Sequence, residues 1–331
     1  MFVRTVLALA AAALVQTASA SAAEASFPIG WTMSPAEGRP AMVQLELSYR
    51  SGGSVGNTSR PVAVADLQGL GEAQLAGPGG PAAFRIVRDA GTIACQGVVR
   101  QRRGTGECRF AGDPRFAAEL ARRGIGRPSG YEQFQLALHG GDLAVVAELE
   151  RQKYARPTVE QLVGLGIHGA GLSYLRALDA AGYRVGSADK LVEMRIHGVS
   201  ADYIAELRTL GFARPSADQL VRMRIHGVSA DYARELAALG YKRLSAEELV
   251  NMRIHGVKPE LVRELARLGY RGVTGEQLTR MAIHGVSPGF VREMAAAGYR
   301  QVPVEDLIRL RIHGVTPEEA RRANAAFRRG D

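Results

Sequence analysis

The sequence predicts an α+β protein whose parts form separate domains: a small antiparallel β-rich module, followed by an α-solenoid of 29-residue helix-hairpin repeats. Two observations lead to this fold class. The histidines recur every 29 residues, and a fixed period of that length is typical of stacked supersecondary units. Before the repeats, apolar and polar residues alternate as in half-buried strands. We place a signal peptide at residues 1–20, the β-rich module at 21–112 and the repeat array at 113–331.

The N-terminus has the parts of a secretory signal peptide. Arg4 is the positive residue, an apolar segment runs from Val6 to Val15, and Ala18-Ser19-Ala20 matches a cleavage site. The apolar segment of about 10 residues is too short to cross a bilayer ~30 Å thick. We therefore expect an exported chain, periplasmic or secreted, with no transmembrane span once it is cleaved. An uncleaved anchor is the alternative.

The β-rich module shows the two-residue alternation of strands between residues 43 and 49, where Val43, Leu45, Leu47 and Tyr49 share one face. We predict further strands at 61–64, 83–88, 92–100 and 107–110, a turn at 51–54, a short helix within 67–75 and a break at 76–81. These strands favour a small antiparallel sheet or a sandwich. Trp31 is expected to fill its core, with a binding-site aromatic as the alternative.

The cysteines of the chain are Cys95 and Cys108. A hairpin turning at Gln101-Arg102 would place them opposite each other. The same register makes two further pairs: Ile93 with Phe110, and Gly97 with Gly106. An even cysteine count in an exported chain favours a disulfide. Two free buried thiols are the alternative, and a catalytic cysteine is disfavoured because the module has no histidine to activate it.

One repeat, residues 216–241, illustrates the local pattern. Ser216 is an expected N-cap with Gln219 in capping-box position. The first helix has an apolar face of four residues: Leu220, Val221, Met223 and Ile225. His226 lies in the last turn and Gly227 ends the helix in the left-handed conformation. A second helix follows; its cap, apolar residues and terminal glycine are Ser229, Tyr232, Leu236, Leu239 and Gly240.

The other repeats follow the same pattern. The expected caps of the first helices are Ser129, Thr158, Ser187, Ser216, Ser245 and Thr274, with Pro303 in the last repeat. Residues 113–120 align with the second helix of a repeat, so the array comprises a half-repeat plus seven repeats. Isolated helices of about ten residues are marginal in water. Each repeat must therefore bury its apolar stripe against its neighbours, which is the definition of a solenoid.

The seven histidines invite a metal hypothesis, which the spacing disfavours. They are His139, His168, His197, His226, His255, His284 and His313. Equivalent atoms on packed helices lie roughly 10 Å apart, whereas ligands of one Zn²⁺ lie within about 4 Å of each other. We interpret the histidines as structural residues at helix ends, where they can bond terminal carbonyls. No metal, cofactor or catalytic residue is predicted, because the chain also lacks HExxH, G-x-S-x-G and Walker A motifs.

Two charged rows share the same period. Arg195, Arg224, Arg253 and Arg311 precede the Ile-His-Gly corners, and Gly166 and Ala282 interrupt this row. The acidic row consists of Glu206, Glu235, Glu264 and Glu293. Either the rows form a surface ion-pair lattice, or the arginines form a stripe for an acidic partner. Variable first-helix positions beside them are further contact candidates: Glu193, Arg222, Asn251, Arg280 and Arg309.

The V-x-M-R-I-H-G-V-[ST]-x-x-[YF] repeats resemble those of some exported bacterial proteins, and are similar to repeats appended to membrane metallopeptidases of the β-lactam-sensor type. The resemblance covers residues 113 to about 322, and Gly30-Trp31-Thr32-Met33 is similar to the module that accompanies such repeats. It implies an envelope-side, non-catalytic module with a regulatory role. The chain lacks the peptidase helices and the zinc motif, so peptidase activity is not carried over.

We therefore expect a non-catalytic scaffold that binds a protein or peptide in the cell envelope. The net charge of +9 is spread without blocks of like charge, and export argues against a nucleic-acid partner. A regulatory accessory of an envelope sensor or protease system is the main alternative. A hydrolase site in the β-rich module is the third, although the acids there show no motif spacing: Glu37, Glu46, Asp66, Glu72 and Asp89.

Overall fold

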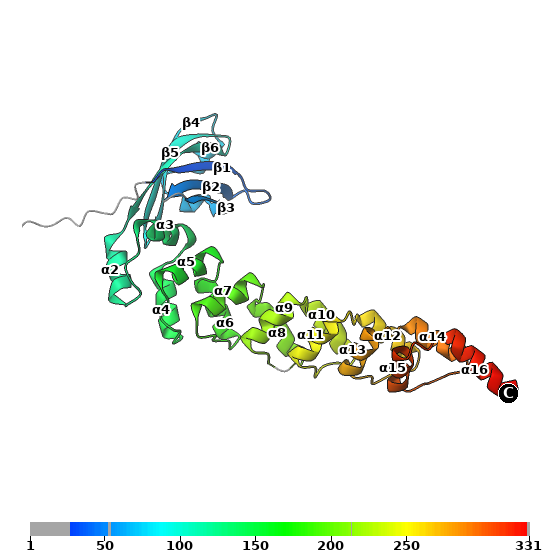
Figure 1. Ribbon diagram of the computed structural model, residues 1–331. Helices are drawn as coiled ribbons and strands as arrows, with labels where there is room; N and C mark the ends of the chain where they lie inside the picture. The colour runs from blue at the N-terminus through cyan, green and yellow to red at the C-terminus, as the bar shows by residue number, and fades with distance from the viewer. Residues whose placement is uncertain (1–26, 52–53, 213, 330–331) are drawn as a thin grey trace, which may run out of the picture. The chain divides into compact units, whose positions relative to one another are not determined.

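Figure 1 shows the computed structural model of the chain, which describes residues 27–51, 54–212 and 214–329. Within these residues a six-stranded antiparallel sheet precedes a long series of short helices, as the fold class predicted. The chain divides into two compact units, residues 1–138 and 139–331. The predicted signal peptide at 1–20, like Gly52 and Gly53 of the predicted turn, lies outside the described residues.

The sheet has the strand order β3-β2-β1-β6-β5-β4, and every neighbouring pair is antiparallel. Its strands are β1 (Ile29–Pro35), β2 (Met42–Ser51), β3 (Ser54–Ala63), β4 (Gly80–Arg88), β5 (Gly91–Arg100) and β6 (Arg103–Gly112). A 3-10 turn, η1 (Val64–Asp66), and a short helix, α1 (Glu72–Ala76), connect β3 to β4.

The sequence interpretation needs four corrections in this module. It missed β1 as a strand, although it placed Trp31 in the core. It began the third strand at Pro61 instead of Ser54, because the polar residues of this edge strand bond to β2 through exposed side chains, as Asn57 does to Glu46 and Ser59 does to Gln44. The helix predicted within 67–75 begins at Glu72, and β4 already begins within the predicted break.

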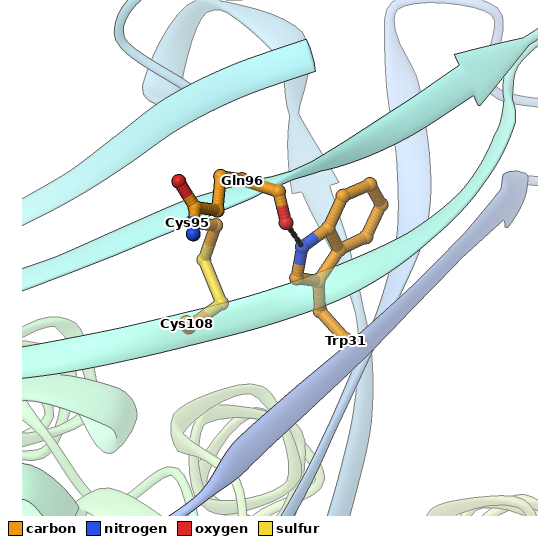
Figure 2. Close-up of a disulfide and its surroundings, with 4 residues drawn as sticks. All are labelled: Trp31, Cys95, Gln96 and Cys108. Carbon is orange, nitrogen blue, oxygen red and sulfur yellow. Dashed lines mark hydrogen bonds between the residues drawn. A yellow bond between two sulfur atoms is a disulfide. The ribbon is translucent and has the colours of Figure 1, made fainter. Parts of the chain in front are cut away.

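The predicted hairpin register between β5 and β6 is confirmed. Cys95 pairs with Cys108 and the two form a disulfide, which lies beside Trp31 in Figure 2. The register also pairs Ile93 with Phe110, and both are buried on the same face as the disulfide.

Trp31 is the centre of this core. Its indole N–H donates to the carbonyl of Gln96 (3.1 Å), its ring packs edge-on against Phe84, and only 1% of the residue is exposed. A Cβ on any of three glycines would approach the indole to within 2.7–2.9 Å: Gly97, Gly104 and Gly106. These glycines therefore make room for the tryptophan across β5 and β6.

Two helices belong to the same compact unit, α2 (Pro114–Arg122) and α3 (Gly130–His139), the latter up to Leu138. Phe134 of α3 packs edge-on against Tyr49 and Phe110 of the sheet. The buried Gln133 side chain donates to the carbonyls of Ala90 and Asp113 (both 2.7 Å). The compact unit thus reaches beyond residue 112 because the first helices pack on the sheet.

The second unit consists of helix pairs arranged in two rows. The first helices α5 (Val159–Ile167), α7 (Ala188–Ile196), α9 (Ala217–Ile225), α11 (Ala246–Ile254), α13 (Gly275–Ile283) and α15 (Val304–Ile312) contact one another in series. The second helices do the same: α4 (Leu143–Arg151), α6 (Leu172–Ala180), α8 (Ala201–Thr209), α10 (Ala230–Ala238), α12 (Pro259–Arg267), α14 (Pro288–Ala296) and α16 (Pro317–Arg329). This arrangement is an α-solenoid.

The predicted helix ends are present. Ser216 and Gln219 form a capping box at the start of α9, whereas Pro303 provides no side-chain cap for α15. At the C-terminus of α9, Gly227 has φ of +72°, and the buried Val228 donates its N–H to Met223 (2.8 Å). This bonding satisfies the last carbonyls of the helix, as in a Schellman motif.

We predict that Gly106→Ala lowers the free energy of unfolding by about 1–3 kcal/mol, the usual cost of overpacking, because its Cβ would meet both the indole and the carbonyl of Gln96. Gly80→Ala, where a Cβ meets nothing within 4 Å, is the matched control. Urea denaturation followed by tryptophan fluorescence measures both variants. Equal stability of the two would contradict the role assigned to Gly106.

Candidate binding surface of the solenoid

Three successive second helices, α6, α8 and α10, each carry a tyrosine that bonds the next repeat. The hydroxyls of Tyr174, Tyr203 and Tyr232 donate to the carbonyls of residues 25 positions later, at 2.7, 2.8 and 2.9 Å. The acceptors are Val199, Val228 and Val257, which are fully buried. Burial raises the pKa of Tyr174 and of Tyr232 to about 12. Each hydroxyl is thus held in its neutral form against the next repeat.

The predicted arginine row lies on these same tyrosines. The guanidinium carbons of Arg195, Arg224 and Arg253 lie 5.3, 5.1 and 5.0 Å from the ring centroids of Tyr174, Tyr203 and Tyr232. Arg311 lies 5.1 Å from Phe290 in the same way. These are cation–π distances.

Two of these arginines also cap the preceding corner. Arg253 Nε donates to the carbonyl of Gly227 (3.0 Å), and Arg311 Nε to that of His284 (3.4 Å). The arginine row therefore has a structural role at the junctions between repeats, in addition to any contact with a partner.

The two charged rows do not form the expected lattice with each other. Glu206, Glu235 and Glu264 instead pair with arginines on the next second helix: Arg234, Arg263 and Arg292. Among the described residues, no carboxylate lies within salt-bridge distance of Arg195, Arg224, Arg253 or Arg311. The sequence interpretation missed the stacking of these arginines on tyrosines, because each tyrosine lies 21 residues before its arginine, on a different helix.

A second set of aromatic residues joins the repeats at the opposite corners. Tyr183, Tyr241 and Tyr270 donate to main-chain carbonyls 32 residues later, at 2.9, 2.6 and 2.9 Å. Arg214 stacks on Tyr183 at 4.5 Å. The pairs α5/α6 and α9/α10 are thus bonded to the following pair by a tyrosine hydroxyl at both ends.

The structure places the histidines at helix C-termini. His226 is the C-cap of α9, and its backbone N–H donates to Arg222 (3.0 Å). Its side chain is exposed, as are those of His168, His255 and His313, while His139, His197 and His284 are half-buried. The described residues contain no group of three or more His, Cys, Asp or Glu side chains suited to a metal ion. The structural role of the imidazoles remains a prediction.

The isoleucine that precedes each histidine is exposed, which corrects the prediction that Ile225 belongs to the apolar face of its helix. Ile225 is 54% exposed. Leu239, placed on the apolar face of the second helix, is only half-buried. The helical phase indicates the reason for Ile225, since it lies about 200° around the helix from Met223. Five further isoleucines at 29-residue spacing are between 50% and 56% exposed: Ile167, Ile196, Ile254, Ile283 and Ile312.

We call this side of the solenoid the corner edge. It comprises the six exposed isoleucines, the histidines that follow them (His168 to His313), and Arg195, Arg224, Arg253 and Arg311 between successive corners. A Cβ on Gly198 would lie 3.2 Å from Arg224, and one on Gly285 3.1 Å from Arg311, which places the guanidiniums beside the preceding corner. The corner edge therefore repeats one aliphatic, one imidazole and one guanidinium group.

The other candidate residues differ in their surroundings. Arg222 and Asn251 are exposed on the first helices. Three others form ion pairs: Arg280 with Glu305, Glu193 with Lys190 and Arg309 with Asp306.

Three acids of the β-rich module have separate partners. Glu46 accepts from Asn57, Asp66 pairs with Arg88, and Glu72 pairs with Arg102. None of these contacts brings two of the acids together, so they give no support to a paired-carboxylate site.

Comparison of the chain with protein-family models, curated proteins and solved structures finds no match. In the described part of the chain, the search for helices with the length and hydropathy of a membrane span finds none. The functional argument therefore depends on the geometry of the corner edge.

We predict that Tyr203→Phe lowers the free energy of unfolding by about 1 kcal/mol, because it leaves the buried carbonyl of Val228 without its donor. The ring itself should still fit, since Phe290 occupies the equivalent site. Tyr299→Phe is the control, because Tyr299 is 38% exposed. Urea denaturation of the three proteins would reject this role if both variants lost the same stability.

We also predict a loss of stability in alkali. The pKa of Tyr174 and Tyr232 is raised by burial from 10 to about 12. Their contribution is therefore fully present below pH 10 and is lost as the pH rises toward 12, because the unfolded chain releases these protons first. The urea concentration at the unfolding midpoint should be lower at about pH 11 than at about pH 8. This decrease should be smaller in Tyr174→Phe/Tyr232→Phe. An unchanged pH dependence in that variant would contradict the assignment.

Proposed function

We propose that the chain is a non-catalytic exported scaffold that binds a protein or peptide partner in the cell envelope along its corner edge. The row of six half-exposed isoleucines carries this proposal. Single exposed apolar residues are normal on protein surfaces, whereas larger exposed apolar areas mark interaction sites. Here they recur at the same position of six successive repeats, and the arginines between them form no salt bridge within the described residues.

Export is part of the proposal and has two supports. Residues 1–20 have the pattern of a signal peptide, and Cys95 and Cys108 form a disulfide. Disulfides persist in oxidising compartments such as the bacterial periplasm.

A regulatory accessory of an envelope sensor or protease system would use the same surface. It differs from the general scaffold in the identity of the partner, which would then be a membrane-bound sensor or protease. The hydrolase alternative has less support, because Glu46, Asp66 and Glu72 of the β-rich module are each bonded to a different side chain.

The experiment compares three immobilised baits in an envelope extract. They are the wild-type mature chain, Ile196→Ser/Ile225→Ser/Ile254→Ser and Val55→Ser/Val87→Ser/Val98→Ser. The valines are exposed aliphatic residues of the β-rich module, with 70%, 41% and 57% exposure, and so match the change without touching the corner edge. We use isoleucine variants because charge reversal of the arginines would also disturb the tyrosine junctions.

We expect a partner that the wild type and the valine variant retain and that the isoleucine variant loses by at least about tenfold, or 1.4 kcal/mol. Thermal unfolding of each bait checks that it is folded. Retention of the same proteins by all three baits would show that the corner edge does not bind them.

A further inference from the structure

The corner edge has a chemical pattern that identifies the kind of partner it fits, an inference that rests on the proposed function. We propose that it takes an acidic polypeptide in the extended polyproline II conformation, with an aliphatic side chain at every third residue. Three features carry this inference: the charge of the edge, the spacing of its isoleucines and its width.

The charge of the edge is positive and uncompensated. Arg195, Arg224 and Arg253 are held in place by stacking on tyrosine rings, and among the described residues they form no salt bridge. Of the acids at the equivalent position after each of these corners, Asp231 is paired with Arg234 and Glu260 with Arg263, whereas Asp202 forms no salt bridge within the described residues.

Arg253 uses its Nε to bond the carbonyl of Gly227. Its two Nη groups have no bond in the described part of the chain, and such groups recognise carboxylates. A row of arginines that has no acidic partner among the described residues is complementary to an acidic ligand.

The spacing of the isoleucines matches an extended chain. Equivalent residues on packed helices recur at about 8–10 Å. In a β-strand the side chains at every third position alternate between the two faces. One turn of polyproline II helix instead contains three residues, covers about 9 Å and returns the side chain to the same side. A ligand with an aliphatic residue at every third position would therefore meet Ile196, Ile225 and Ile254 in turn, with its acidic residues near the arginines between them.

The width of the edge favours an extended chain over a helix. Each corner offers one exposed isoleucine, so the apolar row is a single side chain wide. An amphipathic helix docks through a broader stripe of residues laid into a groove. A bilayer could contact the same groups, and it forms an outcome of the test.

The row also defines the length of the ligand. Arginine is present at three successive junctions, Arg195, Arg224 and Arg253, and Ala282 replaces it at the next. A segment of about nine residues, three for each repeat, covers these three junctions. The strongest subsites are therefore those between Ile167 and Ile254.

The test titrates the full mature chain with labelled synthetic peptides and measures fluorescence anisotropy. The first peptide repeats Leu-Glu-Ser. The second has the same composition with its leucines grouped together, and the third replaces Glu by Lys. Vesicles of phosphatidylglycerol and phosphatidylethanolamine are the lipid arm, measured by cosedimentation. The isoleucine and valine variants described above are titrated in parallel.

We expect the Leu-Glu-Ser peptide to bind at least about tenfold more tightly than the other two, and more weakly as salt is added. The isoleucine variant should lose about tenfold in affinity, and the valine variant should match the wild type. Equal binding of the grouped peptide, equal binding by the isoleucine variant, binding of vesicles alone, or no peptide binding would each overturn the inference. If the isoleucine-dependent partner is still captured from the envelope extract, the proposed function stands and only the extended acidic ligand is wrong.

Discussion

The solenoid depends on one recurring contact, the tyrosine of a second helix that reaches the corner of the next repeat. Most of the helices are only nine residues long, and helices of that length are marginal in water. Tyr203 compensates for this low stability through three contacts of one side chain. Its buried ring packs in the junction, its hydroxyl donates to the carbonyl of Val228, and Arg224 stacks on its face. Each such junction involves two neighbouring repeats, so the stability of a repeat is inseparable from that of its neighbours.

The chain contains its own control for the link between aromatic ring and arginine. At the junction where Ala282 replaces the arginine, Leu261 stands in the position of the tyrosine, and where Gly166 replaces it, Val145 does. Where Phe290 keeps the ring without the hydroxyl, Arg311 is still present and still stacks. The arginine therefore accompanies the ring and not the hydroxyl. The positive charge on the corner edge therefore comes from an arginine that already stabilises the junction. An acidic ligand can bind to this arginine, so no additional basic residue is required.

The sequence predicts what depends on local chemistry. Ser216 and Gln219 mark a helix start, Gly227 marks its end, and the hairpin register through Cys95 and Cys108 follows from alternation and turn length. What it does not predict depends on contacts between distant residues. Trp31 is seated by glycines on two other strands, and Arg224 lies on a ring 21 residues away. The exposure of Ile225 could have been predicted from its angular position on the helix. Its apolar side chain led us to place it on the buried face instead.

A surface built from identical repeats limits the kind of specificity that it can have. Each corner offers the same isoleucine, imidazole and, at four junctions, the same guanidinium, so neighbouring subsites cannot distinguish one aliphatic or acidic residue from another by shape. Discrimination must then come from the number and spacing of contacts that a ligand makes at once. Several weak contacts on one chain act together, because binding of the first raises the effective concentration of the next. A ligand in the wrong register loses most of them together. The corner edge is thus suited to selecting ligands by the spacing of their aliphatic and acidic residues. An irregular pocket of the same area would not select by spacing.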